Sequence, residues 1–146
     1  MADPLGYEAT LSRTLFKKEQ AEGHPREVGA LVVAKQADAM RIVKNYVRIL
    51  DRKINVRKAI LTGSRATGSY LEDSDVDLII VSDDFSKMQL PERLRYLQKQ
   101  WTSKIPLEAF GYTVNEFTTL RRKSTYVKEA VRTGIVLLEG RAPTTS

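Results

Sequence analysis

The segment from Leu61 to Val81 reads LTGSRATGSYLEDSDVDLIIV, and it holds a Gly-Ser turn and two alternating aspartates between two apolar runs. The apolar residues from Val56 to Leu61 predict a strand. This strand is expected to stop at Gly63, because a residue without a Cβ lets the backbone turn sharply and approach a ligand. A second strand is expected from Asp75 to Ser82.

The two aspartates, Asp75 and Asp77, stand two positions apart within the second expected strand. Residues with this spacing point to the same face, with Cα atoms roughly 6.5–7 Å apart. The two carboxylates repel each other, and Glu72 and Asp73 just upstream add negative charge. A bound divalent cation is the simplest compensation. The segment therefore predicts a site for phosphate and metal.

This order of residues resembles the nucleotidyltransferase superfamily that includes DNA polymerase beta, and within it the short minimal nucleotidyltransferases. The family pattern is a Gly-Ser, a second glycine and then Asp-x-Asp on the next strand. It is matched by Gly63, Ser64, Gly68, Asp75 and Asp77. A lone Gly-Ser or Asp-x-Asp occurs by chance, whereas the ordered combination is specific. The resemblance covers residues 31–138.

The resemblance implies metal-dependent transfer of a nucleoside monophosphate, with ATP as the expected donor, to an acceptor hydroxyl. Asp75 and Asp77 would bind Mg²⁺ or Mn²⁺. Family members usually add a third carboxylate, most often Asp, from a neighbouring strand. The candidate here is Glu108, the one acid in the apolar run 105–110, where an acid is costly unless it is paired or metal-bound. The alternative for Glu108 is an edge-strand residue that faces solvent.

The residues expected to bind phosphate are Gly63, Ser64, Arg65 and Gly68. Ser64 begins a short expected helix, where free N–H groups and the positive end of the helix dipole suit an anion. The two glycines let the phosphates come close, although glycines are also common in ordinary tight turns. For Arg65, a surface salt bridge to Glu72 or Asp73 is the alternative to a phosphate contact.

The bulk composition fits one ordinary domain of 146 residues with a formal charge of +6. The basic residues concentrate in segments 41–58 and 121–132, which favours an anionic partner, although solvated helix surface explains them equally well. The chain has no cysteine, and no apolar run approaches the ~20 residues of a membrane span. We expect a cytoplasmic protein without membrane contact.

The expected fold is α/β (α+β), a small mixed sheet of about four strands with helices packed on one side, like the nucleotidyltransferase palm. Residues 1–26 are expected to form a helical arm, residues 27–140 the nucleotidyltransferase domain and residues 141–146 a loose tail. Helices are expected at residues 27–53, at Pro91–Trp101 and from Thr113 to Gly134, the last opened by a capping box with Glu116. The remaining strands are Ile105–Tyr112 and Ile135–Leu138.

The expected partners follow from what the chain lacks, because larger relatives carry extra domains for the nucleobase and the acceptor. A partner protein or a homo-oligomer would supply them. Minimal nucleotidyltransferases are often antitoxins that adenylylate a tyrosine of an HEPN-type ribonuclease, which makes a toxin-antitoxin role the first hypothesis. The alternatives are a non-catalytic subunit that binds nucleotide or masks a partner, and an RNA-binding adaptor that uses the basic helices.

Overall fold

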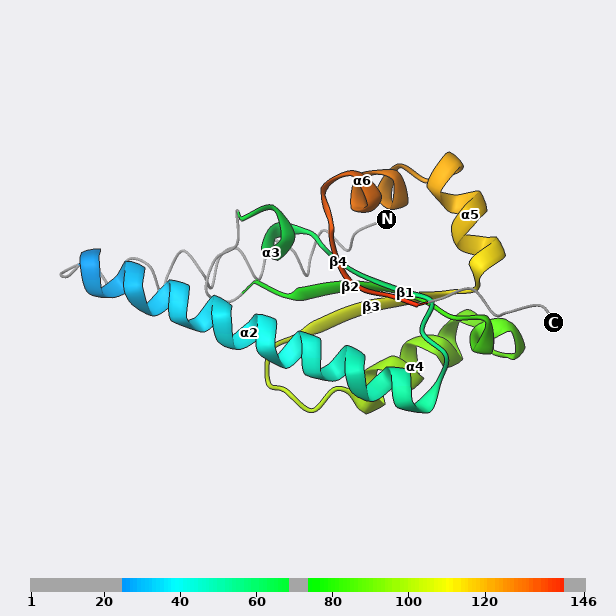
Figure 1. The fold of residues 1–146 in the computed structure, drawn as a ribbon, viewed down its shortest axis with the longest axis horizontal. Coiled ribbons are helices and arrows are strands. Elements are labelled where there is room, and N and C mark those ends of the chain that lie inside the picture. Colours follow the sequence, from blue (N-terminus) through cyan, green and yellow to red (C-terminus); the bar gives the residue numbers. More distant parts are fainter. Residues whose placement is uncertain (1–24, 69–73, 141–146) are drawn as a thin grey trace.

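The protein is built on a single four-stranded sheet (Figure 1). The computed structural model describes residues 25–68 and 74–140, with side chains described from residue 36. The sheet has the order β3-β2-β1-β4 and consists of β1 (Lys58–Thr62), β2 (Val76–Val81), β3 (Leu107–Tyr112) and β4 (Ile135–Glu139). Strand β1 is antiparallel to β2 and β4, whereas β2 and β3 are parallel. The expected α/β class and mixed sheet are confirmed.

Five α-helices accompany the sheet in the part of the chain that the structure describes. They are α2 (Pro25–Lys53), α3 (Ser64–Thr67), α4 (Leu90–Gln100), α5 (Val114–Lys123) and α6 (Thr125–Thr133), with a 3₁₀ helix, η1 (Asp83–Lys87), before α4. The last two residues of the expected arm belong to α2, and the rest of the arm and the tail lie outside the described residues. No helix within these bounds is both long and apolar enough to cross a membrane.

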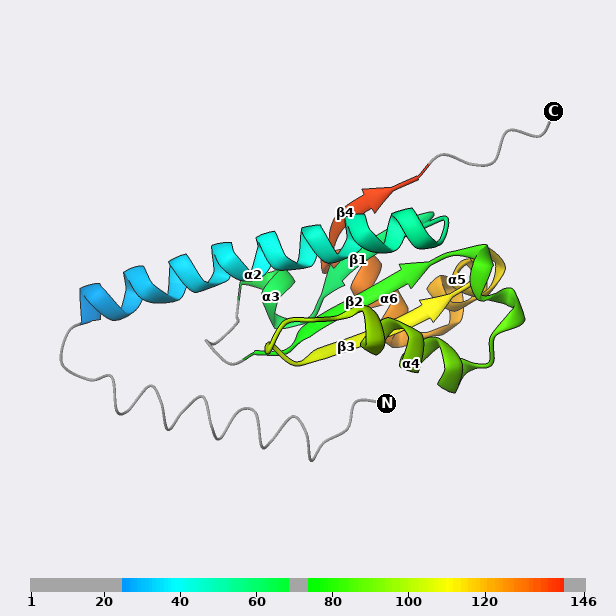
Figure 2. The ribbon, with the colours of Figure 1, turned by 90° about the horizontal axis from the view of Figure 1, so that it is seen from below.

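Helices cover both faces of the sheet (Figures 1 and 2). On one face, side chains such as Leu61 and Leu78 pack with α2 and α4. On the other, Ile60, Ile79 and Val81 pack with residues of α5 and α6. The expectation that the helices pack on one side of the sheet is therefore wrong, because α2 and α4 cover one face and α5 and α6 cover the other. Because β1 and β2 carry apolar side chains on both faces of the sheet, each face needs a covering layer that keeps these side chains from water.

The segment from Thr113 to Gly134 forms two helices, so the expectation of a single helix is wrong. Thr113 opens α5, and the predicted capping box with Glu116 is present. The break falls at Ser124, whose backbone N–H donates to Leu120 and whose hydroxyl accepts from the N–H of Val127. One serine thus ends α5 and caps α6, because a short hydroxyl side chain satisfies a helix N-terminus better than it continues a helix.

An ion pair between the buried Arg93 and the partly exposed Glu116 joins α4, β3 and α5. Arg93 is 5% exposed, and its guanidinium donates to both carboxylate oxygens of Glu116, at 2.6 and 3.2 Å. It also donates to the backbone carbonyls of Gly111 and Met88. Glu116 in turn accepts the N–H of Thr113, and the hydrogen bond from Arg93 lowers the pKa of Glu116. The planar guanidinium therefore connects three elements that are distant in sequence.

Replacing Glu116 with alanine should destabilise the fold by about 1–3 kcal/mol, because it leaves the buried Arg93 guanidinium without its carboxylate and removes half of the capping box. Chemical denaturation of the parent and Glu116→Ala measures the change. The matched control is Glu129→Ala, since Glu129 pairs with Arg132 on the exposed surface of α6. We expect no measurable shift in its midpoint. Equal effects in both variants would contradict a special role for the Arg93–Glu116 pair.

Candidate active site

The Gly-Ser turn and two of the predicted acids meet at one end of the sheet. Thr62, the last residue of β1, lies opposite Asp77 in the antiparallel pair with β2. Asp77 lies opposite Glu108 in the parallel pair with β3. These three residues form one line across the sheet, and we call Thr62, Asp77 and Glu108 the acidic row. Alternation along each strand places the row on the face that α5 and α6 cover further along the sheet.

Gly63 is fixed by its contact with Asp77. Its φ is +71°, a left-handed backbone conformation that residues other than glycine rarely adopt. A Cβ added to Gly63 would lie 2.3 Å from the Asp77 Oδ2 atom. The carboxylate of Asp77 therefore occupies the space that any larger residue at position 63 needs, and the turn is built against this acid.

Helix α3 follows the turn directly and consists of a single turn. Its N-cap residue is Gly63, and it ends at Gly68, which has a left-handed φ of +84°. The backbone N–H of Gly68 closes the helix on the carbonyl of Ser64. Ser64, half-buried, is thus the first helical residue beside the acidic row. This is the position from which the sequence predicts a phosphate contact.

The acids interact strongly around Asp77. Burial, the charge and hydrogen bond of Glu108 and the charge of Asp75 together raise the pKa of Asp77 to about 7, while Arg65 opposes the shift. Asp75 lies immediately before β2 and is half-buried, and Glu108 is exposed on the edge strand β3. Two of the predicted acids, Asp75 and Glu108, thus act on the third, Asp77, and favour its protonated form when no cation neutralises their charge.

The donor set fits a hard divalent cation, because carboxylate oxygens are the ligands that Mg²⁺ and Mn²⁺ prefer. The mutual repulsion that raises the pKa of Asp77 is the kind that a cation relieves. Within the described residues, no three acid, histidine or cysteine side chains already converge as a ready-made metal cage. The closest arrangement is the facing pair of Asp77 and Glu108, with Asp75 beside it.

Arg65 is directed into the fold. It is 6% exposed, its Nε donates to the carbonyl of Ser74 at 2.9 Å, and its Nη1 donates to the Gln36 side chain at 2.6 Å. Gln36 returns a hydrogen bond to the Arg65 carbonyl at 3.3 Å. Arg65 therefore links α3 to α2 and to the segment that enters β2. Its expected contact with phosphate stays a prediction, and its alternative partners lie outside the described residues.

Sequence reasoning missed Tyr126 as a neighbour of the site. Its ring meets that of Phe110 edge-to-face, with centroids 5.8 Å apart, and Phe110 stands two residues from Glu108 on the same face of β3. Burial and then the charges of Asp77 and Glu108 raise the pKa of Tyr126. The signal that would have located it is Ser124, because the helix break there turns Tyr126 over β3.

Comparison with known proteins agrees with this geometry. A family model described as "Nucleotidyltransferase domain" matches residues 43–132. Two proteins of Methanocaldococcus jannaschii, each named "Putative protein adenylyltransferase", are similar in sequence. The first is 42% identical over 45 residues, which cover 30% of this chain and 45% of that protein. The second is 26% identical over 101 residues, which cover 68% of this chain and 94% of that protein. For the first, the match thus spans less than half of the relative's length.

A solved structure shares the fold. It is described as a crystal structure of a putative nucleotidyltransferase from Sulfolobus solfataricus, superimposes with a TM-score of 0.54 at 20% sequence identity, and covers 72% of this chain and 84% of that one. Together with the family match over most of the domain, the fold and the site define the class. The chain belongs to the nucleotidyltransferase family and is a nucleotidyltransferase enzyme. Members of this family generally use divalent metal ions.

Asp77→Asn should stabilise the metal-free protein, and more so at about pH 8 than at about pH 5. The pKa of Asp77 is raised to about 7 in the fold from 3.8. The folded state therefore binds the proton more tightly, and stability falls as pH rises from about 4 through about 7. Asparagine resembles the neutral acid and removes this loss. Thermal unfolding in EDTA across this range measures the effect.

The control for this pH series is Asp38→Asn, which removes the same charge from an exposed position on α2. Its melting temperature should follow the pH dependence of the parent. If Asp77→Asn and the parent differ by a constant amount at every pH, the acidic row does not hold a proton near neutrality.

Proposed function

We propose that the chain transfers AMP from ATP to an acceptor hydroxyl, with pyrophosphate as the leaving group. The observation that carries this proposal is the meeting of the Gly63-Ser64 turn with Asp77 and Glu108 in one row. Phosphoryl and nucleotidyl transfer require little covalent chemistry from the protein. They require positioned phosphates, an oriented acceptor and compensation of negative charge, and this end of the sheet offers residues for each.

The triphosphate would be bound at the turn. Gly63 allows close approach because it has no side chain, and the Ser64 hydroxyl and backbone N–H are hydrogen-bond donors beside the acidic row. Gly68 closes α3 without adding bulk, and the space on its Cβ side is open, with no atom of a described neighbour within 4 Å. The nucleotide would thus lie with its phosphates against α3 and its reacting phosphorus toward Asp77.

The acids would bind the cations, and one of them would accept the proton of the acceptor hydroxyl. Asp75, Asp77 and Glu108 are the residues that would bind Mg²⁺ or Mn²⁺, which neutralise the phosphates and lower the pKa of an attacking hydroxyl. Glu108 is exposed at the sheet edge, so an acceptor can reach it from solvent. There it accepts the hydroxyl proton as the new O–P bond forms and the bond to pyrophosphate breaks.

A protein hydroxyl is the acceptor that we favour. The relatives in Methanocaldococcus jannaschii are named as protein adenylyltransferases, and the family resemblance suggests a tyrosine of an HEPN-type ribonuclease that the chain would silence as an antitoxin. The exposed position of Glu108 at the sheet edge supports a large acceptor. A second copy of the chain is the alternative partner.

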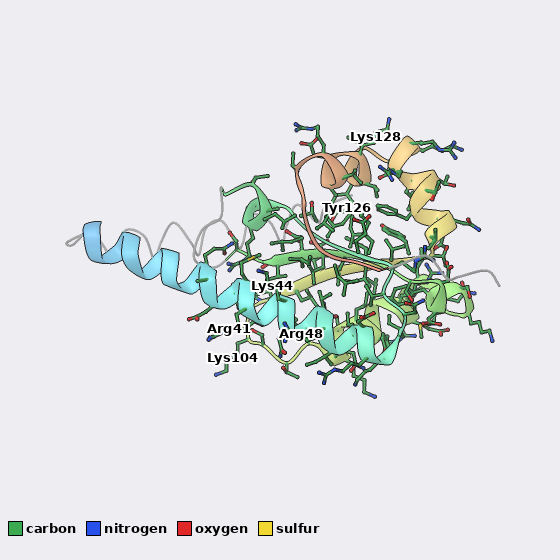
Figure 3. All side chains as sticks on the ribbon, viewed as in Figure 1. Arg41, Lys44, Arg48, Lys104, Tyr126 and Lys128 are labelled. Atoms are coloured by element: carbon green, nitrogen blue, oxygen red, sulfur yellow. The ribbon has the colours of Figure 1, made fainter. Side chains whose placement is uncertain are left out.

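A second candidate function is RNA binding through the outer face of α2. Arg41, Lys44 and Arg48 lie along this helix (Figure 3), and Lys104 is exposed on the loop before β3. Arg41 pairs with the exposed Asp38, and the others are available to phosphates. Helix α2 packs on the face of the sheet opposite the acidic row. This basic face is therefore compatible with catalysis. It could bind RNA independently of the transfer reaction.

ATP binding should require a divalent cation, because the acidic row otherwise repels the phosphates. Calorimetric titration with and without Mg²⁺ tests this. Ser64→Ala should weaken binding in Mg²⁺ by about 1–3 kcal/mol, the loss expected for a hydrogen bond to a charged group. Ser86→Ala, on the exposed surface of η1 at the far end of β2, should bind like the parent. Equal affinity in EDTA would contradict the metal-dependent site.

Transfer itself is tested with ATP labelled on its α-phosphate, Mg²⁺ or Mn²⁺, and an extract of the native host. We expect label on a protein. Asp77→Asn should abolish labelling because the metal ligand is lost, and Glu108→Gln should reduce it at least about tenfold if Glu108 accepts the proton. Label on RNA would favour the second candidate function. Label on no molecule would contradict the enzyme activity proposed for this site.

A further inference from the structure

Tyr126 is a nucleophilic side chain beside the acidic row that the proposed reaction does not use. It lies in the first turn of α6 and points from this helix toward the sheet, whereas Lys128 points away from the sheet (Figure 3). Its ring packs edge-to-face on Phe110. Phe110 and Glu108 are neighbours on one face of β3, about 6.5–7 Å apart along the strand. The Tyr126 ring therefore packs on the residue that follows Glu108 on this face of β3.

The electrostatics agree with this placement. After burial, the largest causes that raise the pKa of Tyr126 are the charges of Asp77 and Glu108, so its hydroxyl lies within their field. Tyr126 is nevertheless 43% exposed, and a nucleotide can reach it from solvent. The phenol thus combines access with proximity to the residues that would bind the reacting phosphate.

The other described tyrosines lack this combination. Tyr46 is 4% exposed and donates its hydroxyl to the Leu97 carbonyl in the core between α2 and α4. Tyr96 lies on α4 and responds to Asp84. Tyr112 stacks on the same Phe110 ring at 6.5 Å, but the charge that acts on it is that of Glu116, at the opposite end of β3.

The Tyr126 side chain is also restrained before any nucleotide binds. Ser124 fixes the start of α6 by accepting the N–H of Val127 at 3.2 Å, and Phe110 supports the tyrosine ring from the sheet. An acceptor held in place in this way has already lost much of the freedom that a free acceptor loses in reaching the transition state. An internal tyrosine at this position therefore competes effectively with an acceptor from solution.

We infer that Tyr126 is an internal acceptor and that the chain adenylylates itself there, an activity that rests on the proposed function. The phenolic oxygen forms a bond to the α-phosphorus of ATP, and the bond from this phosphorus to the pyrophosphate oxygen breaks. Pyrophosphate leaves, and the phenolic proton passes to the carboxylate of Glu108. The product is a tyrosyl-AMP phosphodiester between α6 and the acidic row.

The test begins with the purified chain, ATP and Mg²⁺ or Mn²⁺. Intact-mass spectrometry should show the addition of one AMP, and peptide mapping should place it on Tyr126. Tyr126→Phe keeps the ring contact with Phe110 and removes only the hydroxyl, so it should lose the modification while keeping the parent's melting temperature. The matched control is Tyr112→Phe, which also contacts the Phe110 ring and should be modified like the parent.

The geometry also requires transfer within one molecule. Isotope-labelled Asp77→Asn keeps Tyr126 but lacks a metal ligand, and it should stay unmodified when mixed with active parent. Modification of this variant, modification of Tyr126→Phe to the parent's extent, or AMP on another residue would each overturn the inference. If the chain labels a partner but never itself, the inference fails and the proposed function stands. If it labels no molecule, both fail.

Discussion

The contact between the Asp77 carboxylate and the Gly63 backbone is the constraint on which this end of the molecule depends. Because an Asp77 oxygen fills the space of a Cβ on residue 63, strand β1 has to end at Thr62 and the chain has to turn with a left-handed φ. Helix α3 then begins at Ser64, beside the acid rather than beyond it. The glycine is thus required by a neighbouring functional group as much as by the turn.

The acidic row is supported by an apolar layer and by partial charge compensation. The next row along the sheet consists of Ile60, Ile79 and Phe110, and the first two are almost completely buried. Arg65, held by Ser74 and Gln36, acts to lower the pKa of Asp77, and burial and the two acids outweigh it. The fold therefore tolerates an unfavourable cluster by fixing it on a well-packed sheet, as is common where chemistry is performed.

Local patterns in the sequence predict the strands and the meeting of the glycine turn with the acids, because alternation and glycine geometry are properties of neighbouring residues. Contacts between distant residues explain the failures. The apolar spacing continues across Ser124, so it conceals the break that places Tyr126 over β3. In α4 the apolar Leu90 and Leu94 share one face at helical spacing, yet they are 57% and 40% exposed. Arg93 is buried instead, because its partners come from β3 and α5.

The ion pair of Arg93 has a consequence for how the site can change in evolution. Arg93 binds the carbonyl of Gly111, three residues from Glu108 on the edge strand β3, and thereby holds this strand against α4 and α5. An edge strand has only one neighbour to fix its position. The distance between Glu108 and Asp77 thus depends in part on residues that contact neither acid. Suppressor mutations that restore a weakened site are therefore to be sought in α4 and α5 as well as among the carboxylates.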